Sequence, residues 1–284
     1  MKATKHPRRL PPLSCLILCL WLYIPLSGMT APPDTPAPAL DSLMRTVVAE
    51  PDSTRKIAAM NAFAAALENA LRQDATMNRT FDSIPHLGIL TSKDRKVRIV
   101  TWNLPLSPAR HIYYGIVQFR AGEKLHTTVL RDVKDSLAAP PETALLEQGR
   151  WFGALYYDLL QHKAGQQTHY TLLGYDFHTG ITHRKLLEAL SFDSAGTPLF
   201  GTPLFDNGQW KAGRVLLEYS AASPFFLRYL PRKKMIVYQR MQLQQVAPGY
   251  PPAGVPTDIF DGLVFKNTCW QFQPDVPLTA KDFK

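Results

Sequence analysis

The stretch HYTLLGYDFHTGITHRKLLEALSF, residues 169–192, decides the fold. Two runs rich in aromatic and aliphatic residues, 169–177 and 184–192, flank a short segment that contains Gly180. Apolar runs of this length on either side of a turn are typical of neighbouring antiparallel strands. The sequence therefore predicts a β-hairpin at this position.

The same alternation of apolar runs and turn-rich breaks continues from Phe81 to the end of the chain. The breaks are rich in Gly, Pro, Asp, Asn and Ser, and Asn207-Gly208 suits a tight turn with positive φ. The apolar runs are residues 86–91, 96–104, 110–120, 124–131, 151–161, 169–177, 184–192, 213–220, 225–230, 234–241, 259–266 and 268–272. About twelve short strands predict a mainly β fold, an antiparallel meander arranged as a sandwich, a barrel or a propeller-like sheet.

Two helices are expected before the strands. Apolar side chains recur at helical spacing over residues 40–48, and Pro51 ends that periodicity. A second amphipathic stripe runs over about residues 54–76. We therefore expect an N-terminal α-helical hairpin at residues 40–78, packed on an antiparallel β domain at residues 79–284.

The start of the chain has the pattern of an export signal. Four basic residues precede an apolar run at residues 13–26, and small residues follow up to Ala31. That run is shorter than the roughly 20 residues that a helix needs to cross a bilayer. The sequence predicts a cleaved signal peptide at residues 1–31 and a Pro-rich spacer at residues 32–39, with a retained anchor as the alternative. We expect a periplasmic or extracellular protein with no transmembrane span after signal removal.

Charge and cysteine content restrict the possible partners. Four of the 32 basic residues lie in the predicted signal and all 23 acidic residues follow it, so the remainder has a net charge of +5. No basic helical stripe or nucleic-acid-binding module occurs, and no nucleic-acid partner is expected. Of the three cysteines only Cys269 follows the signal, so no intrachain disulfide is expected there.

A set of aromatic and turn motifs occurs between residues 96 and 273. The motifs are Trp102–Leu106, Tyr113–Gly115, Gly153–Tyr157, Tyr170–Asp176, Glu218–Ser220 and Phe260–Phe265. In order and spacing this set resembles an uncharacterised family of exported β-rich proteins of Bacteroidetes-type bacteria, which has no known activity. The resemblance implies export and a β-rich body, and it implies no site residues.

Common catalytic signatures are absent from the sequence. It contains no nucleophile elbow, no His-Glu-x-x-His, no glycine-rich dinucleotide motif, no P-loop and no Cys-x-x-Cys. Their absence favours an exported, non-enzymatic binding or envelope-associated module, with an envelope protein or a glycan as partner. No cofactor is expected. The alternative is a hydrolase that acts on a glycan or a peptide.

The best local cluster of chemically active side chains lies in the predicted hairpin. His169, Asp176, His178 and His183 are four potential ligands within 15 residues. Neutral imidazoles and a carboxylate can hold a zinc-like ion if the turn brings them together. In the competing interpretation the segment is a simple turn, in which Asp176 accepts hydrogen bonds from nearby backbone N–H groups.

The hydrolase hypothesis uses the same region. Its catalytic candidates are Asp176, His178 and His183. Cleavage of a glycosidic bond needs a second carboxylate about 5–9.5 Å from the first. The candidates for that second carboxylate are Asp193, Asp206 and Glu218.

Aromatic residues are the other candidate for binding. In the pairs Tyr113-Tyr114 and Tyr156-Tyr157 one ring is expected to point inward and its neighbour outward, because side chains alternate along a strand. Outward rings can stack on sugars or contact a protein partner. Core filling is the competing explanation for these rings. The other aromatic candidates are Trp102, Trp151, Trp210 and Trp270.

Overall fold

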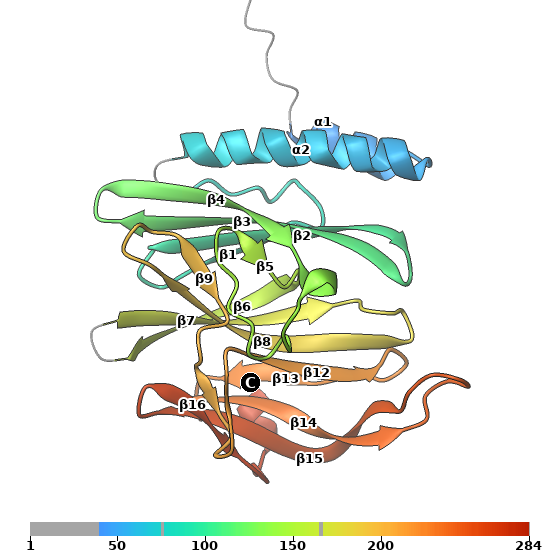
Figure 1. Cartoon of the computed structure of the whole chain (residues 1–284), viewed down its shortest axis with the longest axis vertical. Coiled ribbons are helices and arrows are strands. Elements are labelled where there is room, and N and C mark those ends of the chain that lie inside the picture. Colours follow the sequence, from blue (N-terminus) through green and yellow to red (C-terminus); the bar gives the residue numbers. More distant parts are fainter. Residues whose placement is uncertain (1–39, 75–76, 165–166, 284) are drawn as a thin grey trace, which may run out of the picture. The chain divides into compact units, whose positions relative to one another are not determined.

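Two helices and two β-sheets form the part of the chain that the computed structural model describes, residues 40–74, 77–164 and 167–283 (Figure 1). This part belongs to one unit of the chain, residues 38–284. The predicted signal peptide and spacer, residues 1–39, lie outside the described residues.

The predicted helical hairpin is present as α1 (Leu40–Ala49) and α2 (Ser53–Gln73). Asp52 caps α2, because its side chain accepts a hydrogen bond of 2.9 Å from the backbone N–H of Arg55. Two short 3₁₀ helices, η1 (Lys134–Ser136) and η2 (Ala280–Phe283), occur farther along the chain.

The first sheet is a meander with strand order β1-β2-β3-β4-β5. Its last pair, β4 with β5, is parallel, and the other pairs are antiparallel. We call it sheet A. Its strands are β1 (Gly88–Thr91), β2 (Val97–Ser107), β3 (Arg110–Ala121), β4 (Lys124–Asp132) and β5 (Arg150–Trp151).

The second sheet, sheet B, follows the order β11-β10-β16-β15-β12-β8-β7-β6. Three further strands lie off this path: β9 pairs with β8, β14 pairs with β15, and β13 pairs with β14. Two of its pairs, β10 with β16 and β12 with β15, are parallel. Its strands are β6 (Leu155–Ala164), β7 (Gln167–Asp176), β8 (Thr182–Phe192), β9 (Pro198–Phe200), β10 (Phe205–Asp206), β11 (Lys211–Ala212), β12 (Arg214–Ser220), β13 (Leu227–Leu230), β14 (Met235–Gln244), β15 (Ala253–Lys266) and β16 (Cys269–Gln273).

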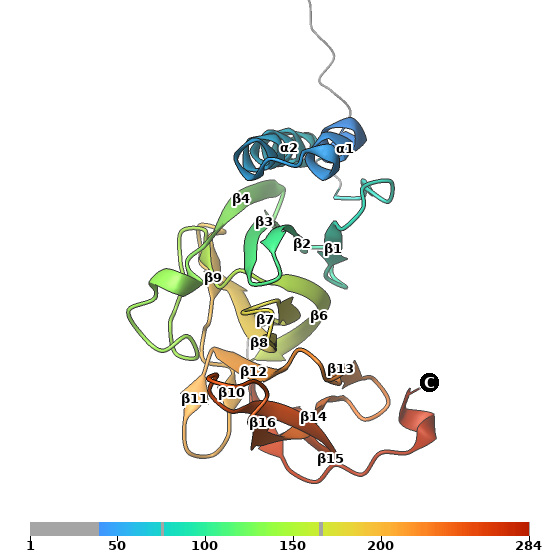
Figure 2. The ribbon, with the colours of Figure 1, turned by 90° about the vertical axis from the view of Figure 1, so that its right-hand side faces the viewer.

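The elements stack in layers with an apolar core between each layer and the next (Figures 1 and 2). The helices cover one face of sheet A, where Phe63 packs edge-on against Trp102. The other face of sheet A packs on the β6–β8 part of sheet B. The opposite face of β6–β8 packs on the strands from β12 to β16, through residues such as Trp270. Three cores therefore separate four layers.

The β7–β8 hairpin is buried on both faces. Leu172 and Leu186 lie in the core toward sheet A, while Leu173 and Leu187 lie in the core on the other side, and all four are 0% exposed. Because neighbouring residues of a strand point to opposite faces, a doubly covered strand needs consecutive apolar residues. This explains the Leu-Leu pairs in residues 169–192.

The predicted mainly β fold with an N-terminal helical hairpin is confirmed. Of the three arrangements left open, the sheets stack face to face like a sandwich, and neither sheet closes into a barrel within the described residues. Each of the twelve predicted runs contains a strand, but the prediction missed the short strands β5, β9, β10 and β11. The three parallel pairs also depart from a pure antiparallel meander.

The tyrosine pairs point to opposite faces, as expected. Tyr156 is buried and Tyr157 is 41% exposed. Tyr113 lies in the core between the sheets, whereas Tyr114 packs under the helices and stacks on Trp102. The ring of Tyr114 is covered because the helices pack on one face of sheet A and sheet B packs on the other.

Buried polar side chains hold α2 on sheet A. Arg98, 1% exposed, pairs with Asp74 at the end of α2, with 2.8 Å between Nη1 and Oδ2. Gln118 accepts a hydrogen bond from Arg98 and donates one of 2.8 Å to the carbonyl of Leu71. These bonds satisfy charged and polar groups that would otherwise be buried without partners.

An ion pair is enclosed in the core between the two sheets. Arg214 and Glu188 lie directly opposite each other on β12 and β8, and both side chains are 0% exposed. Arg214 Nε donates a 2.7 Å hydrogen bond to Glu188 Oε1, and the hydroxyl of Tyr156 donates to Oε2. Arg214 also donates to the carbonyl of Pro141 and lies 5.1 Å from the ring centre of Phe152.

We expect Glu188→Gln to lower the free energy of unfolding by about 3–5 kcal/mol, because it leaves the guanidinium of Arg214 buried without a counter-charge. Urea unfolding measures the change. Glu68→Gln is the control, because the Glu68–Arg72 pair on α2 is 31% and 51% exposed and should contribute less than about 0.5 kcal/mol. Equal effects of the two substitutions would contradict the prediction.

Candidate functional site

The segment between β7 and β8, residues 177–181, forms the predicted turn. Asp176 accepts a 3.2 Å hydrogen bond from the backbone N–H of His178, as the simple-turn interpretation expects. His178 and Gly180 have φ of 48° and 79°. A Cβ at Gly180 would lie 2.8 Å from the carbonyl oxygen of Pro108, so the turn requires glycine there.

Asp176 is buried and only partly satisfied. It is 1% exposed, and its Oδ1 lies 3.0 Å from Nζ of Lys134. Its Oδ2 is enclosed, and no donor among the described residues meets it in hydrogen-bond geometry. The Lys134 ammonium lies 3.7 Å from the ring centre of Tyr113, whose hydroxyl accepts a 2.8 Å hydrogen bond from Phe177 N–H. Burial and the nearby Asp176 charge raise the pKa of Tyr113 well above its usual value.

Glu218 on β12 lies beside His178, with 3.5 Å between His178 Nε2 and Glu218 Oε1. The carboxylate also accepts hydrogen bonds of 2.9 Å from Thr182 Oγ1 and 3.0 Å from Arg184 Nε. The bond with His178, followed by those with Thr182 and Arg184, lowers the pKa of Glu218 to about 2. This carboxylate is therefore ionised at any ordinary pH.

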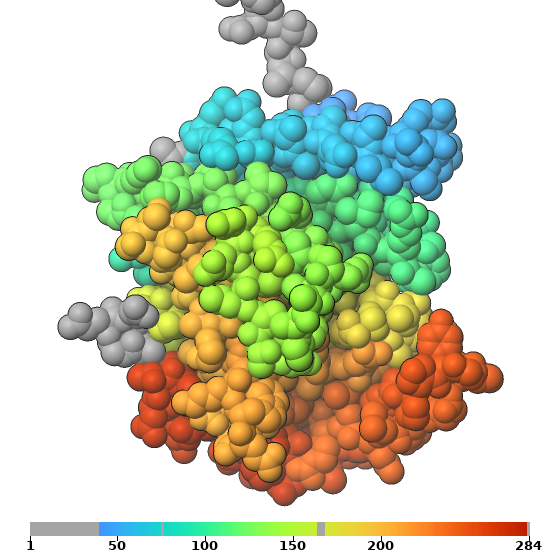
Figure 3. Space-filling model, in the orientation of Figure 1, coloured from blue at the N-terminus to red at the C-terminus, as the bar shows by residue number. Residues whose placement is uncertain are grey.

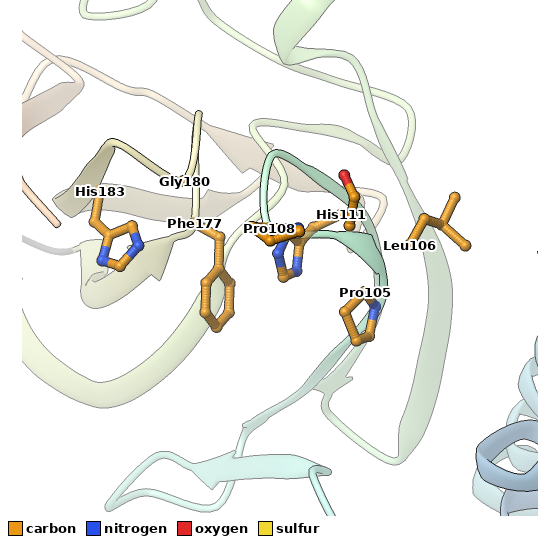
Figure 4. Close-up of a pocket in the computed structure, with 8 residues that line it drawn as sticks. Pro105, Leu106, Pro108, His111, Phe177, Gly180 and His183 are labelled. Atoms are coloured by element: carbon orange, nitrogen blue, oxygen red, sulfur yellow. The ribbon is translucent and has the colours of Figure 1, made fainter. Parts of the chain in front are cut away.

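A row of rings lies on the other side of the turn. The rings of His111 on β3 and Phe177 stack with centres 4.1 Å apart and planes at 2°. Phe177 meets the ring of His183 edge-on at 5.7 Å, and Nδ1 of His183 lies 2.6 Å from the hydroxyl of Tyr175. Figure 4 shows His183, Phe177 and His111 in sequence along one hollow. Burial lowers the pKa of both imidazoles, which favours their neutral forms.

The predicted metal ligands do not all come together. His169 is seven residues from Asp176 along β7, about 23 Å at the rise of an extended strand. It pairs instead with His162 on β6. No group of three or more His, Cys, Asp or Glu side chains within the described ranges is arranged to hold a metal ion. His178 and Asp176 do lie together, and His183 lies on the opposite side of the turn.

Of the three candidates for a second carboxylate, Glu218 alone lies at this turn. Asp193 is beyond the far end of β8, where its side chain accepts hydrogen bonds from Ala195 and Thr197 backbone N–H groups. Asp206 is on β10, which belongs to the layer beyond β6–β8.

Three hollows meet at His111, which lines all of them. The first, the apolar groove, has a volume of about 500 Å³ between the helices and sheet A. Its apolar lining includes Met44, Val47, Met60, Trp102 and Leu104. The second, the tip hollow of about 530 Å³, is lined by Pro105, Pro108, Phe177 and His183.

The third, the polar hollow, has a volume of about 360 Å³ and shares His111 with the apolar groove. Its lining includes Tyr113, Lys134, Asp176, His178 and Tyr250. The hollow is large enough for a small polar group, and the buried Asp176 forms part of its wall.

The apolar groove contains a few polar groups. Lys56 is half-buried in it, and its ammonium has no ion-pair partner among residues 40–74, 77–164 and 167–283. Asn103 Nδ2 lies 2.7 Å from Nδ1 of His111. Since the amide donates to Nδ1, the neutral ring of His111 carries its proton on Nε2. His86 lines the groove with a φ of 62°, an uncommon conformation for a residue other than glycine.

Sequence reasoning missed most of this site. Lys134 lies in a segment without strand or helix periodicity, and Met60 reads as an ordinary member of a helical stripe. His111 is 65 residues before Asp176 and lies on another sheet. No local pattern connects these side chains, because they come together only when the helices and sheet B pack on opposite faces of sheet A.

Comparison with protein-family models, with curated proteins and with solved structures finds no match to this chain. The geometry of the site is therefore the basis for its interpretation. Of the helices in the described ranges, neither is both long and apolar enough to span a membrane.

Asp132 adds a second carboxylate beside Lys134. Its Oδ2 lies 3.5 Å from Lys134 Nζ, its Oδ1 accepts a 3.0 Å bond from Lys134 N–H, and its side chain is 21% exposed. Burial raises its pKa from 3.8 to about 6, an effect that Lys134 opposes. Gly153 has a φ of 69°, and a Cβ there would lie 2.2 Å from this carboxyl group.

We expect Asp132 to make the protein less stable as pH rises from about 4 to about 6. The unfolded chain releases this proton first, because the pKa in the folded state is about 6 against 3.8 unperturbed. At about 1.4 kcal/mol per pH unit, this amounts to a loss of up to about 3 kcal/mol. Asp132→Asn should remove the loss, so the variant should gain stability over the wild type between pH 4 and pH 7.

Urea unfolding at several pH values measures this difference. Asp258→Asn is the matched control, because Asp258 is an exposed residue of the same charge that does not contribute to the pKa of Asp132. If the difference in free energy of unfolding between Asp132→Asn and the wild type does not change with pH, the raised pKa of Asp132 is refuted.

Proposed function

We propose that this protein is an exported, non-enzymatic binding protein that holds a small amphiphilic molecule at the apolar groove. The observation that carries the proposal is the meeting of an apolar groove and a polar hollow at His111. A molecule with an apolar body and a polar end would find a complementary surface for each part. Sites for small molecules are typically concave, mostly apolar, and about 300–1,000 Å³ in volume.

The charges in the groove indicate which end group it suits. Lys56 lies beside the apolar lining and forms no ion pair with any residue that the structure describes, so an acidic group is favoured there. The polar hollow has Lys134, Asp176 and His178 in its lining, so it suits a polar end group better than an apolar one. We therefore infer an amphiphile with an acidic group and a polar end.

Export is part of the proposal and rests on the sequence. Residues 1–31 have the order of basic, apolar and small residues that a signal peptide has. A periplasmic or extracellular location would expose the groove to lipids and to components of the cell envelope. An envelope protein or glycan as a further partner is compatible with this location.

We expect 1-anilinonaphthalene-8-sulfonate, a probe with fused apolar rings and an anionic sulfonate, to bind saturably to one site. Val48 lines the groove and is 65% exposed, so Val48→Asp should not disturb folding. The new carboxylate should weaken probe binding about fivefold or more, which is about 1 kcal/mol. Fluorescence titration of the probe measures the affinity.

Val129→Asp is the control for this titration, because Val129 is 49% exposed on β4 and lines none of the three hollows. Its affinity for the probe should equal that of the wild type. Non-saturable binding, or equal weakening by both substitutions, would argue against the groove as a ligand site.

A hydrolase is the second candidate, supported by the enclosed Oδ2 of Asp176 beside Lys134 and His178. Glu218 weighs against it as the general acid, because a carboxyl group with a pKa of about 2 holds no proton to donate. Asp176 is itself engaged by the Lys134 ammonium. The geometry therefore favours binding over hydrolysis.

We expect no hydrolysis that depends on Asp176 when the protein is incubated with a panel of chromogenic glycosides and fluorogenic peptides. Asp176→Asn and His178→Ala, compared with the wild type, separate true turnover from a contaminant. Turnover by the wild type that both substitutions abolish would make the hydrolase the correct function.

A further inference from the structure

A second site lies on sheet B, among residues that the proposed amphiphile site does not use. Two of the large exposed apolar side chains, Trp210 at 45% and Phe272 at 42%, line the same cleft of about 330 Å³. Trp210 precedes β11, and Phe272 lies on β16. The hairpin of β10 and β11 is at the surface beside the C-terminal strands (Figure 3).

Hydrogen bonds hold the Trp210 segment in place. The side chain of Asn207 accepts bonds of 3.0 Å and 2.9 Å from the backbone N–H groups of Gln209 and Trp210. Asp206 accepts a 2.8 Å bond from the N–H of Gly208, whose φ is 87°. The turn is therefore held by hydrogen bonds from its own side chains, and these bonds place Trp210 at the surface.

Packing does not explain the exposed rings. Trp270 precedes Phe272 by two residues on the same face of β16 and is 0% exposed in the core. Phe272 lies where that core ends, and neither Phe272 nor Trp210 contacts another aromatic ring among the described residues. The floor of the cleft is the rim of that core, formed by Phe205, Val215 and Leu263.

Polar side chains also line the cleft. Asp206, Asn207 and Gln209 line it together with Tyr238. The side chain of Gln209 is exposed, and no described residue bonds to its amide. None of the described lining residues is cationic, and the one acid, Asp206, has Lys211 at 3.8 Å. This balance disfavours phosphates and other strongly charged ligands.

We propose that the cleft binds a neutral pyranose unit of a glycan. The apolar C–H face of the sugar would lie on the indole of Trp210, and Phe272 would cover its edge. The sugar hydroxyls would bond to the carboxylate of Asp206 and the amide of Gln209, which offer acceptors and donors together. A polyhydroxylated ring can pair with these polar side chains while its C–H face covers the indole.

Trp210 supplies its own signal for the test, because the other tryptophans in the described ranges, Trp102, Trp151 and Trp270, are 1% exposed or less. The full chain is titrated with neutral hexasaccharides of glucose, mannose, galactose and N-acetylglucosamine in α and β linkages. At least one should shift the tryptophan emission to shorter wavelength and protect it from acrylamide. The same sugar should give a dissociation constant by calorimetry.

Trp210→Ala should weaken that binding about tenfold or more, which is about 1.4 kcal/mol. Trp210→Phe should retain most of the affinity and lose the fluorescence change, which also covers the case in which the alanine variant folds poorly. Leu243→Ala is the matched control, because Leu243 is 74% exposed and outside the cleft. Val48→Asp, in the apolar groove, should also leave sugar binding unchanged, which separates this site from the proposed amphiphile site.

Two results would overturn the inference. One is the absence of binding to every hexasaccharide of the panel. The other is a sugar that binds with the same affinity to the wild type and to both Trp210 variants.

Discussion

Burial of both faces of the β7–β8 hairpin is the constraint on which the rest of the structure depends. Sheet A covers one face and the strands from β12 to β16 cover the other, so the hairpin contributes to two cores at once. At roughly 25 cal/mol per Å² of apolar surface, such double burial stabilises a fold that has no disulfide among its described residues. The Glu188–Arg214 pair lies in one of these cores, and its directional bonds match β8 to β12 in one register.

The same stacking creates the candidate site. Layers that meet face to face leave their ends open, and the turn after Asp176 reaches such an end beside the β2–β3 turn of sheet A. The helices extend over the other side of β2 and complete the apolar groove. His111 therefore lines both an apolar groove and a hollow that contains charged side chains. This contrast is the basis of the proposed binding function.

Much of the fold could be predicted from local patterns. Apolar runs between turn-rich breaks located twelve of the strands, and helical periodicity located α1 and α2. The short strands β5, β9, β10 and β11 were missed because two or three residues carry no period, and their partners supply their conformation. Part of the predicted ligand cluster is present, because Asp176 and His178 lie together. His169 lies near the other end of β7. Lys134 and His111 could not be predicted as site residues, because no motif or spacing connects them with Asp176.

The sequence by itself determined the class of elements, their positions along the chain, the turn between β7 and β8 and the candidate export signal. These properties depend on backbone preferences and on side-chain periodicity within one segment. Only the tertiary structure decided which strands are neighbours, which faces are covered twice and which polar groups share a hollow. Contacts such as Lys134 with Asp176, 42 residues apart, form after the layers assemble, and no local rule contains that information.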